Sequence, residues 1–292
     1  MPKTMTGSQR GFTLAEAVIV IAITGIVAAT VAIFIRLPVQ GYLDSAARAE
    51  LTDTADTALR RISRDIRLAV PNSVRVSSAG GVDYIEFLLA NTGGRYLAEE
   101  DNPTDPVARP FLSFDNPAQT SFTVVGGLAA GAQEIAVGNR IVVYNLGSGQ
   151  APADAYVGGN IATVSAVDTG NSRITLASNP FAAQVPVMSS PARRFDVVQT
   201  PVTYACNPAA GTLTRYWGYP ISAAQPINAA TAPLSNGQNA LLARGVVGCT
   251  FAYSNPGNFR SGLVGVQLAM QTPGSASGTV VLFHQVHVKN TP

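Results

Sequence analysis

The chain has 292 residues, of which 47% are apolar and only 12% are charged. This charged fraction is about half that of an ordinary soluble domain, and it excludes a highly charged disordered protein. The net charge of +2 also argues against a protein that binds nucleic acid through a strongly basic surface. Lys3 and Arg10 are the only charged residues among the first eleven, so the positive excess lies in a short N-terminal leader.

A long apolar segment follows this leader. Residues 17–35 contain no charged side chain. As an α-helix they would span about 28 Å, close to the roughly 30 Å hydrocarbon core of a bilayer. Because Lys3 and Arg10 precede the segment, the positive-inside rule places the N-terminus in the cytoplasm and the residues after position 36 across the membrane.

An acidic side chain, Glu16, stands at the start of the apolar segment. A carboxylate at this depth is costly, so it indicates a function and requires a partner group. Two simpler interpretations remain open at this point. The segment could belong to a secretory signal peptide with a small-residue cleavage site near residues 28–32, or to an ordinary single-span anchor.

Residues 11–16 read GFTLAE, after a short basic leader and before the apolar segment. This combination resembles the processing motif of type IV prepilins. The resemblance implies that residues 1–11 form a prepilin leader, that a prepilin peptidase cleaves between Gly11 and Phe12, and that Phe12 is then N-methylated. Residues 12–38 would form a hydrophobic transmembrane and assembly helix.

Glu16 acquires an assembly role from this resemblance. The freed amine of Phe12 is a cation near the membrane. When such helices bundle, Glu16 of one subunit can neutralise the Phe12 amine of a neighbour. In a low-dielectric bundle this pair is favoured chiefly because each unpaired charge would be costly, so it would fix register more than it would add stability.

Residues 39–72 are expected to continue the helix outside the membrane as an amphipathic segment. Their apolar residues recur at steps of three and four, which is typical of one buried helical face. Pro71 should stop the helix. Pro38 and Gly41 should interrupt or bend it earlier.

Arginines gather between positions 60 and 75. Asp56 lies four residues before Arg60, and such an i,i+4 spacing favours a local ion pair. No aromatic residues alternate with these arginines to stack on bases. We therefore expect a solvated helix face and no nucleic-acid partner.

From residue 73 onward, short β-prone runs alternate with Gly, Pro, Asn and Ser, which indicates a β-rich head over residues 73–292. Residues 126–191 are interpreted as β-hairpins inserted into this head, not as a second domain. The predicted fold class is α+β: a long N-terminal transmembrane and amphipathic helix packed on an antiparallel β-sheet head with a β-hairpin insertion. The expected strands cover residues 73–78, 83–89, 121–125, 134–137, 140–144, 161–167, 173–176, 194–198, 202–206, 212–216, 249–253, 262–270 and 278–288.

The two cysteines, Cys206 and Cys249, both lie in the C-terminal third. If the head lies outside the cytoplasm, they should form a disulfide. Two buried free thiols are the alternative.

No catalytic residue, cofactor site or metal site is expected, because the sequence contains no GxSxG, HExxH or P-loop motif. His284 and His287 lie in a strand-like run. Three positions apart on a strand, they point to opposite faces and do not easily chelate one ion. An enzyme is therefore the least expected class.

Several passages of the head, among them RFDVVQTPVTYAC, GTLTRYWGYPI and LFHQVHVKNTP, resemble the MshO-type minor pilins of mannose-sensitive haemagglutinin (MSHA) pilus systems. The resemblance implies a minor pilin of the initiating or tip complex. It would be held in the bacterial inner membrane by a single span, with its head in the periplasm, and would later reach the pilus and cell surface. Implied partners are the prepilin peptidase, other minor and major pilins, the inner membrane and the pilus assembly platform.

Other members of the same superfamily are close alternatives. J-type pseudopilins of type II secretion and W-type minor pilins share the N-terminal helix and a large β-rich head. A tip adhesin or a DNA-binding minor pilin is a further alternative, from a different functional class.

Overall fold

The computed structural model describes residues 11–101, 105–254, 261–272 and 278–292. The leader residues Lys3 and Arg10 lie outside the described residues. The chain divides into two compact units, residues 1–50 and residues 51–292, and one helix contributes to both.

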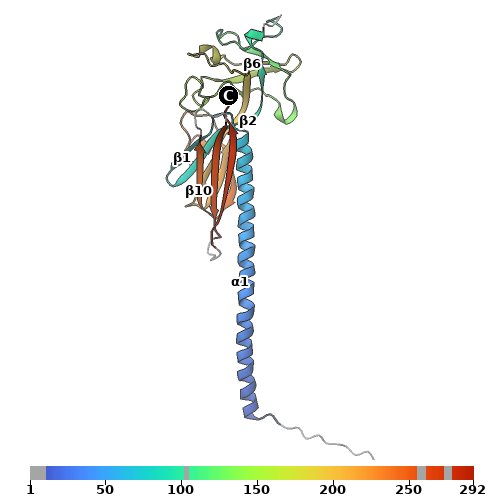
Figure 1. Ribbon diagram of the computed structural model, residues 1–292, viewed down its shortest axis with the longest axis vertical. Coiled ribbons are helices and arrows are strands. Elements are labelled where there is room, and N and C mark those ends of the chain that lie inside the picture. The colour runs from blue at the N-terminus through green and yellow to red at the C-terminus, as the bar shows by residue number, and fades with distance from the viewer. Residues whose placement is uncertain (1–10, 102–104, 255–260, 273–277) are drawn as a thin grey trace, which may run out of the picture. The chain divides into compact units, whose positions relative to one another are not determined.

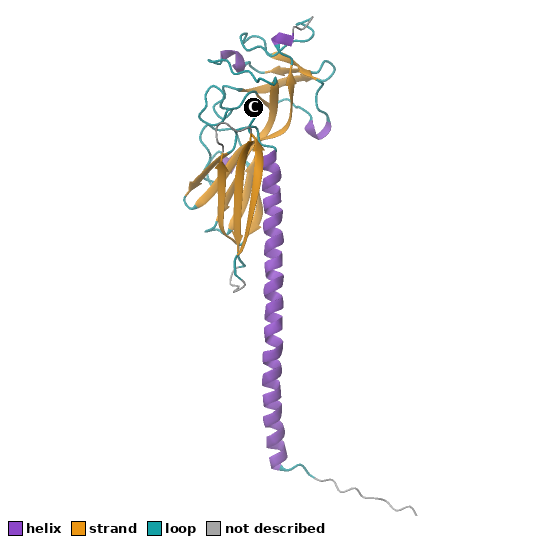
Figure 2. Cartoon of the chain, viewed as in Figure 1, coloured by secondary structure: helices purple, strands orange, loops and turns teal. Residues whose placement is uncertain are grey.

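Helix α1 (Leu14–Arg67) is continuous over 54 residues and contains Pro38 (Figures 1 and 2). Of the expectation that Pro38 and Gly41 interrupt or bend the helix, the interruption is therefore wrong. Proline removes one backbone N–H from the helical hydrogen-bond ladder, and uninterrupted helix-forming sequence on both sides maintains the helix across that position.

The helix ends at Arg67, a few residues before the expected stop at Pro71. The next residues already pair with a strand. The N–H of Val70 donates to the carbonyl of Leu88 at 2.9 Å, and the N–H of Ala90 donates to the carbonyl of Leu68 at 2.9 Å. These backbone groups are therefore hydrogen-bonded to a strand and do not continue the helix.

The second unit contains two antiparallel sheets (Figure 1). The larger has nine strands in the order β1-β2-β3-β6-β5-β4-β7-β8-β9, with an additional pairing between β2 and β7, and the smaller has the order β10-β11-β12. The strands are β1 (Arg75–Ala79), β2 (Val82–Tyr96), β3 (Ser121–Val125), β4 (Arg140–Val142), β5 (Ile161–Asp168), β6 (Arg173–Leu176), β7 (Arg194–Asn207), β8 (Thr212–Trp217), β9 (Gln238–Arg244), β10 (Val246–Ser254), β11 (Ser261–Met270) and β12 (Val280–Lys289). Short 3-10 helices are η1 (Glu99–Asp101), η2 (Gly131–Gln133), η3 (Pro180–Ala183) and η4 (Leu234–Asn236). The helix and antiparallel sheets confirm the predicted α+β class.

The main hydrophobic core forms where the end of α1 meets side chains of both sheets. Its helix residues recur at steps of three and four, as the sequence pattern predicts, and each is almost completely buried. Burying one Leu or Ile side chain stabilises a fold by about 1.5–3 kcal/mol, so this stripe anchors α1 to the head. The helix residues are Ala55, Ala58, Leu59, Ile62 and Ile66.

A second hydrophobic core lies around β3, β4, β5 and β6. Residues 126–191 supply β4, β5 and β6 to the nine-stranded sheet. The core also takes side chains from outside that range, including Tyr96, Phe122 and Phe195, and the rings of Phe122 and Phe195 meet edge to face at 5.6 Å. Packing therefore ties these hairpins to both flanking segments of the head.

Three features of the sheets differ from the expected strands. Residues 134–137 form no strand and follow η2, whereas β9 was not expected because its Ala- and Leu-rich sequence lacks β-branched residues. The runs at 194–198 and 202–206 are one strand, β7, although Pro201 lies within it. On one side of β7 the pairing with β4 ends at Val198 and the pairing with β8 begins at Val202, so Pro201 occurs where no donor is needed on that side.

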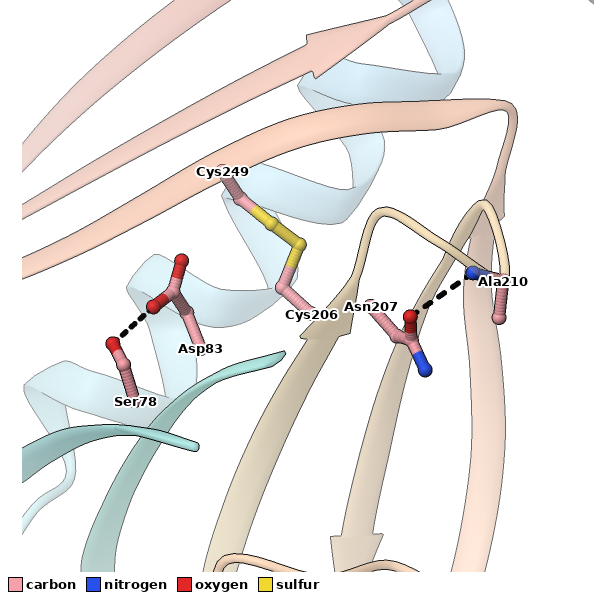
Figure 3. The surroundings of a disulfide bond; sticks show 6 residues. All are labelled: Ser78, Asp83, Cys206, Asn207, Ala210 and Cys249. Carbon is pink, nitrogen blue, oxygen red and sulfur yellow. Dashed lines mark hydrogen bonds between the residues drawn. A yellow bond between two sulfur atoms is a disulfide. The ribbon is translucent and has the colours of Figure 1, made fainter. Parts of the chain in front are cut away.

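The structure joins Cys206 and Cys249 in a disulfide, as the sequence analysis expects for a head outside the cytoplasm (Figure 3). Cys206 is buried on β7, and Cys249 lies on β10, so the bond links the two sheets. Nearby hydrogen bonds tighten the adjoining turns. The Ser78 hydroxyl donates to Asp83, and the N–H of Ala210 donates to the Asn207 side chain at 3.0 Å.

Replacing both cysteines by alanine should lower the free energy of unfolding by about 4 kcal/mol, because the bond closes a loop with a sequence separation of 43 residues. Guanidinium unfolding of the full chain in detergent measures this. Reduction of the unaltered chain should give a similar loss. If the double variant and the reduced chain each lost less than about 1 kcal/mol, the disulfide would not stabilise the fold by restricting the unfolded chain.

Candidate processing and assembly site

The first turn of α1 is closed by a reciprocal pair of side chains, Thr13 and Glu16. The N–H of Glu16 donates to Oγ1 of Thr13 at 3.3 Å, and the N–H of Thr13 donates to Oε2 of Glu16 at 3.0 Å. The Thr13 hydroxyl also donates to Oε2 of Glu16 at 3.0 Å. This is a capping box, which satisfies backbone donors that have no partner within the helix.

The capping box gives Glu16 a second contact that the sequence analysis missed. The sequence pattern Thr-x-x-Glu ahead of an apolar run predicts such a capping box. In the single chain, Glu16 is held by Thr13, within the same turn. The cap therefore fixes the position of the Glu16 carboxylate at the start of the helix.

The apolar part of α1 has its large side chains exposed. Phe12 is 79% exposed and Leu14 is 84% exposed, and none of the most apolar 18-residue window is buried against the rest of the chain. The hydroxyls of Thr24 and Thr30 donate back to helix carbonyls at 2.7 and 2.9 Å. Such a surface has length and composition suited to crossing a membrane, where backbone and hydroxyl groups must be satisfied internally.

The arginines between positions 60 and 75 do not form one surface. Arg60 makes the predicted i,i+4 pair, with Nε 2.5 Å from Oδ2 of Asp56 on the exposed side of the helix. Arg75 instead lies in the head, where its Nε is 2.6 Å from Oε2 of the fully buried Glu86. Arg60 therefore belongs to a solvated helix face, whereas Arg75 belongs to a buried ion pair.

The buried pair of Arg75 and Glu86 has a structural role. Burial raises the pKa of Glu86, although the Arg75 guanidinium opposes this shift. The hydroxyl of Tyr219 donates to Glu86 at 3.0 Å, and Arg75 donates to the carbonyls of Ser222 and Ala223 at 2.9 and 2.7 Å. These contacts hold the segment after β8 against β1 and β2.

His284 and His287 point to opposite faces of β12, as predicted. His284 is half-buried, with Nδ1 3.5 Å from the hydroxyl of Ser63, whereas His287 is exposed. In the described ranges, no group of three or more His, Cys, Asp or Glu side chains is arranged to hold a metal ion.

The comparisons with known proteins give one match. A family model described as the prokaryotic N-terminal methylation motif matches residues 7–32. No curated protein and no solved structure matches the chain. The match covers the GFTLAE sequence, the capping box and most of the exposed apolar helix. Together with the helix-and-sheet fold, this motif supports a type IV pilin-like protein that takes part in the assembly of a pilus or pseudopilus.

Proposed function

We propose that the chain is a minor pilin of an MSHA-type type IV pilus. A prepilin peptidase cleaves between Gly11 and Phe12, and Phe12 is N-methylated. The apolar helix holds the chain in the inner membrane with the head in the periplasm, and the processed subunit then enters the fibre. The methylation motif at residues 7–32 and the exposed apolar surface of the helix support the prepilin part of this proposal. The MSHA-type assignment rests on the resemblance of the head passages.

The size of the head supports a minor rather than a major subunit. Residues 51–292 form one compact unit with two sheets and two principal hydrophobic cores. A head of this size is hard to repeat along a closely packed shaft, but it is readily placed at a tip or in an initiating complex. Quantitative proteomics of sheared fibres tests this role. The chain should be far less abundant than the main pilin, and equal abundance would overturn the proposal.

Deletion of the gene distinguishes a pilus from a secretion pseudopilus. Loss of surface pili with normal secretion of extracellular enzymes is the expected phenotype. Loss of enzyme secretion with normal pili would overturn the pilus assignment and favour a J-type pseudopilin.

Glu16→Gln should separate the two contacts of Glu16. Glutamine keeps the acceptor of the capping box but removes the charge that would neutralise a neighbour's Phe12 amine. We expect normal processing at Gly11 but at least about tenfold less protein in sheared fibres, because an unpaired amine in the helix bundle is costly. Glu16→Ala, which removes both contacts, is the companion variant. If the Glu16→Gln protein assembled normally and only the alanine variant failed, the charge-pairing role would be wrong.

A further inference from the structure

A hollow of about 600 Å³ lies where four elements of the head meet: the end of α1, the C-terminal part of β2, the start of β7 and the end of β12. Its volume falls within the range of about 300–1,000 Å³ that is usual for small-molecule sites. Its lining includes Gly93 and Gly94. A Cβ at Gly93 would approach the Phe195 carbonyl to 2.7 Å, and one at Gly94 would approach the Phe195 ring to 2.8 Å, so close packing excludes side chains there.

The rim of this hollow is basic. Arg67, Arg95, Arg194 and Lys289 come from the four different elements and are all exposed. Among the described residues, no acidic group lies within 4 Å of the guanidinium of Arg67, Arg95 or Arg194. Planar guanidinium groups are the usual partners of carboxylates, which they bind through two hydrogen bonds. The rim is therefore suited to an anionic group.

One acidic side chain, Asp196, also lines the hollow and is half-buried. Within the described part of the chain, no side chain or backbone N–H donates a hydrogen bond to its carboxyl group. Burial raises the pKa of Asp196 to about 6, although Lys289 and Arg194 oppose this shift. Asp196 is thus an acceptor that a ligand with hydroxyl donors could satisfy.

From this combination we infer that the hollow binds a small acidic sugar, such as a uronic acid. The sugar carboxylate would meet the guanidinium groups of Arg95 and Arg194, and a sugar hydroxyl would donate to Asp196. A nucleic-acid strand fits less well, because the one aromatic ring in the lining, Phe195, is buried and cannot stack on a base. The inference does not depend on the proposed assembly role.

Calorimetric titration of the full chain in detergent with D-glucuronate tests the inference, with D-glucose as the neutral control. Glucuronate should bind, and glucose should bind at least about tenfold more weakly. Arg95→Gln combined with Arg194→Gln should weaken glucuronate binding by at least about tenfold, since hydrogen bonds to charged groups contribute at this level. Arg244→Gln, an exposed arginine on β9 outside the hollow, is the matched control and should leave binding unchanged.

The pH dependence gives an independent readout. The charged side chains that line the hollow with Asp196 are Arg67, Arg95, Arg194 and Lys289, and Pro292, which carries the terminal carboxyl group, lines it as well. Asp196 loses its proton between pH 5 and pH 7.5, which changes both its strength as an acceptor of the sugar hydroxyl and its repulsion of the sugar carboxylate. Glucuronate binding should therefore differ between these two pH values, and Asp196→Asn should remove the difference.

Three results would overturn the inference. These are no glucuronate binding at either pH, equal binding of glucuronate and glucose, and equal weakening by the Arg244 control. Binding of a hexaglutamate peptide or a single-stranded oligonucleotide in the absence of glucuronate binding would assign the basic rim to a macromolecular partner and overturn it as well.

Discussion

Gly11→Val should leave the chain uncleaved at its leader. Gly11 is exposed, and a Cβ at this position would meet no atom within 4 Å, so the substitution disturbs no contact of the chain itself. Any effect must therefore arise in the peptidase, where a branched side chain displaces the scissile bond. A displacement of about 1 Å costs a reaction on the order of 100-fold, and we expect cleavage to fall by at least that factor.

Mass spectrometry of the N-terminus, on protein from membranes of the native host, measures this cleavage. The unaltered chain should begin at methylated Phe12 and the Gly11→Val chain at Met1. Gly25→Ala is the matched control, because a Cβ at Gly25 also meets no atom within 4 Å, and it should be processed normally. If the unaltered chain began at Met1 it would be a plain anchor, and a start near residues 29–33 would make it a secreted protein. Either result would overturn the proposed processing.

Uncleaved protein should also be missing from the fibre. Without cleavage there is no free amine at Phe12 for the Glu16 of a neighbour to neutralise. Loss of processing and loss of assembly should therefore occur together in Gly11→Val, whereas Glu16→Gln should lose assembly alone. Together, the two variants would show that leader processing precedes assembly into the fibre.

Local patterns in the sequence predict much of this fold. The apolar steps of three and four predict which face of α1 is buried, and residues 121–125 and 173–176 coincide with β3 and β6. Helices and strands can each be recognised from the spacing of their apolar residues, because burial of one face makes apolar residues recur at a regular interval along the chain. The disulfide between Cys206 and Cys249 was expected from the compartment, and the structure places the two sulfurs together.

What local patterns cannot give is the set of contacts between distant segments. Strand β9 has a mostly exposed, Ala- and Leu-rich sequence, and its conformation depends on pairing with β8. The basic hollow combines Arg67, Arg95 and Arg194, which belong to three different elements. No spacing rule brings such residues together, since only the tertiary fold determines their neighbours.

The buried contact between Asp65 and Arg215 is another such case, and its removal should strongly destabilise the head. Oδ2 of Asp65 accepts hydrogen bonds from Nε of Arg215 at 2.7 Å and from the hydroxyl of Tyr204 at 2.8 Å. Asp65 is 4% exposed and Arg215 is 8% exposed. The charged residues near Arg60 predict a solvated helix face, whereas the structure buries Asp65 against the larger sheet.

Asp65→Ala should lower the free energy of unfolding by about 3–5 kcal/mol, because it leaves a buried guanidinium without its counter-charge. It also removes the acceptor of Tyr204. Burial and the charge of Asp65 both raise the pKa of Tyr204, so its hydroxyl stays protonated and needs an acceptor. Guanidinium unfolding of the full chain in detergent measures the loss.

Two further variants separate the lost ion pair from lost packing. Asp56→Ala removes an acid on the same helix whose pair with Arg60 is largely exposed, and it should cost at most about 1 kcal/mol. Asp65→Ala combined with Arg215→Met should be more stable than Asp65→Ala alone, since no unpaired charge then remains buried. If the double variant were as unstable as the sum of the single changes, the two side chains would not be coupled. The loss would then reflect packing of α1 on the sheet.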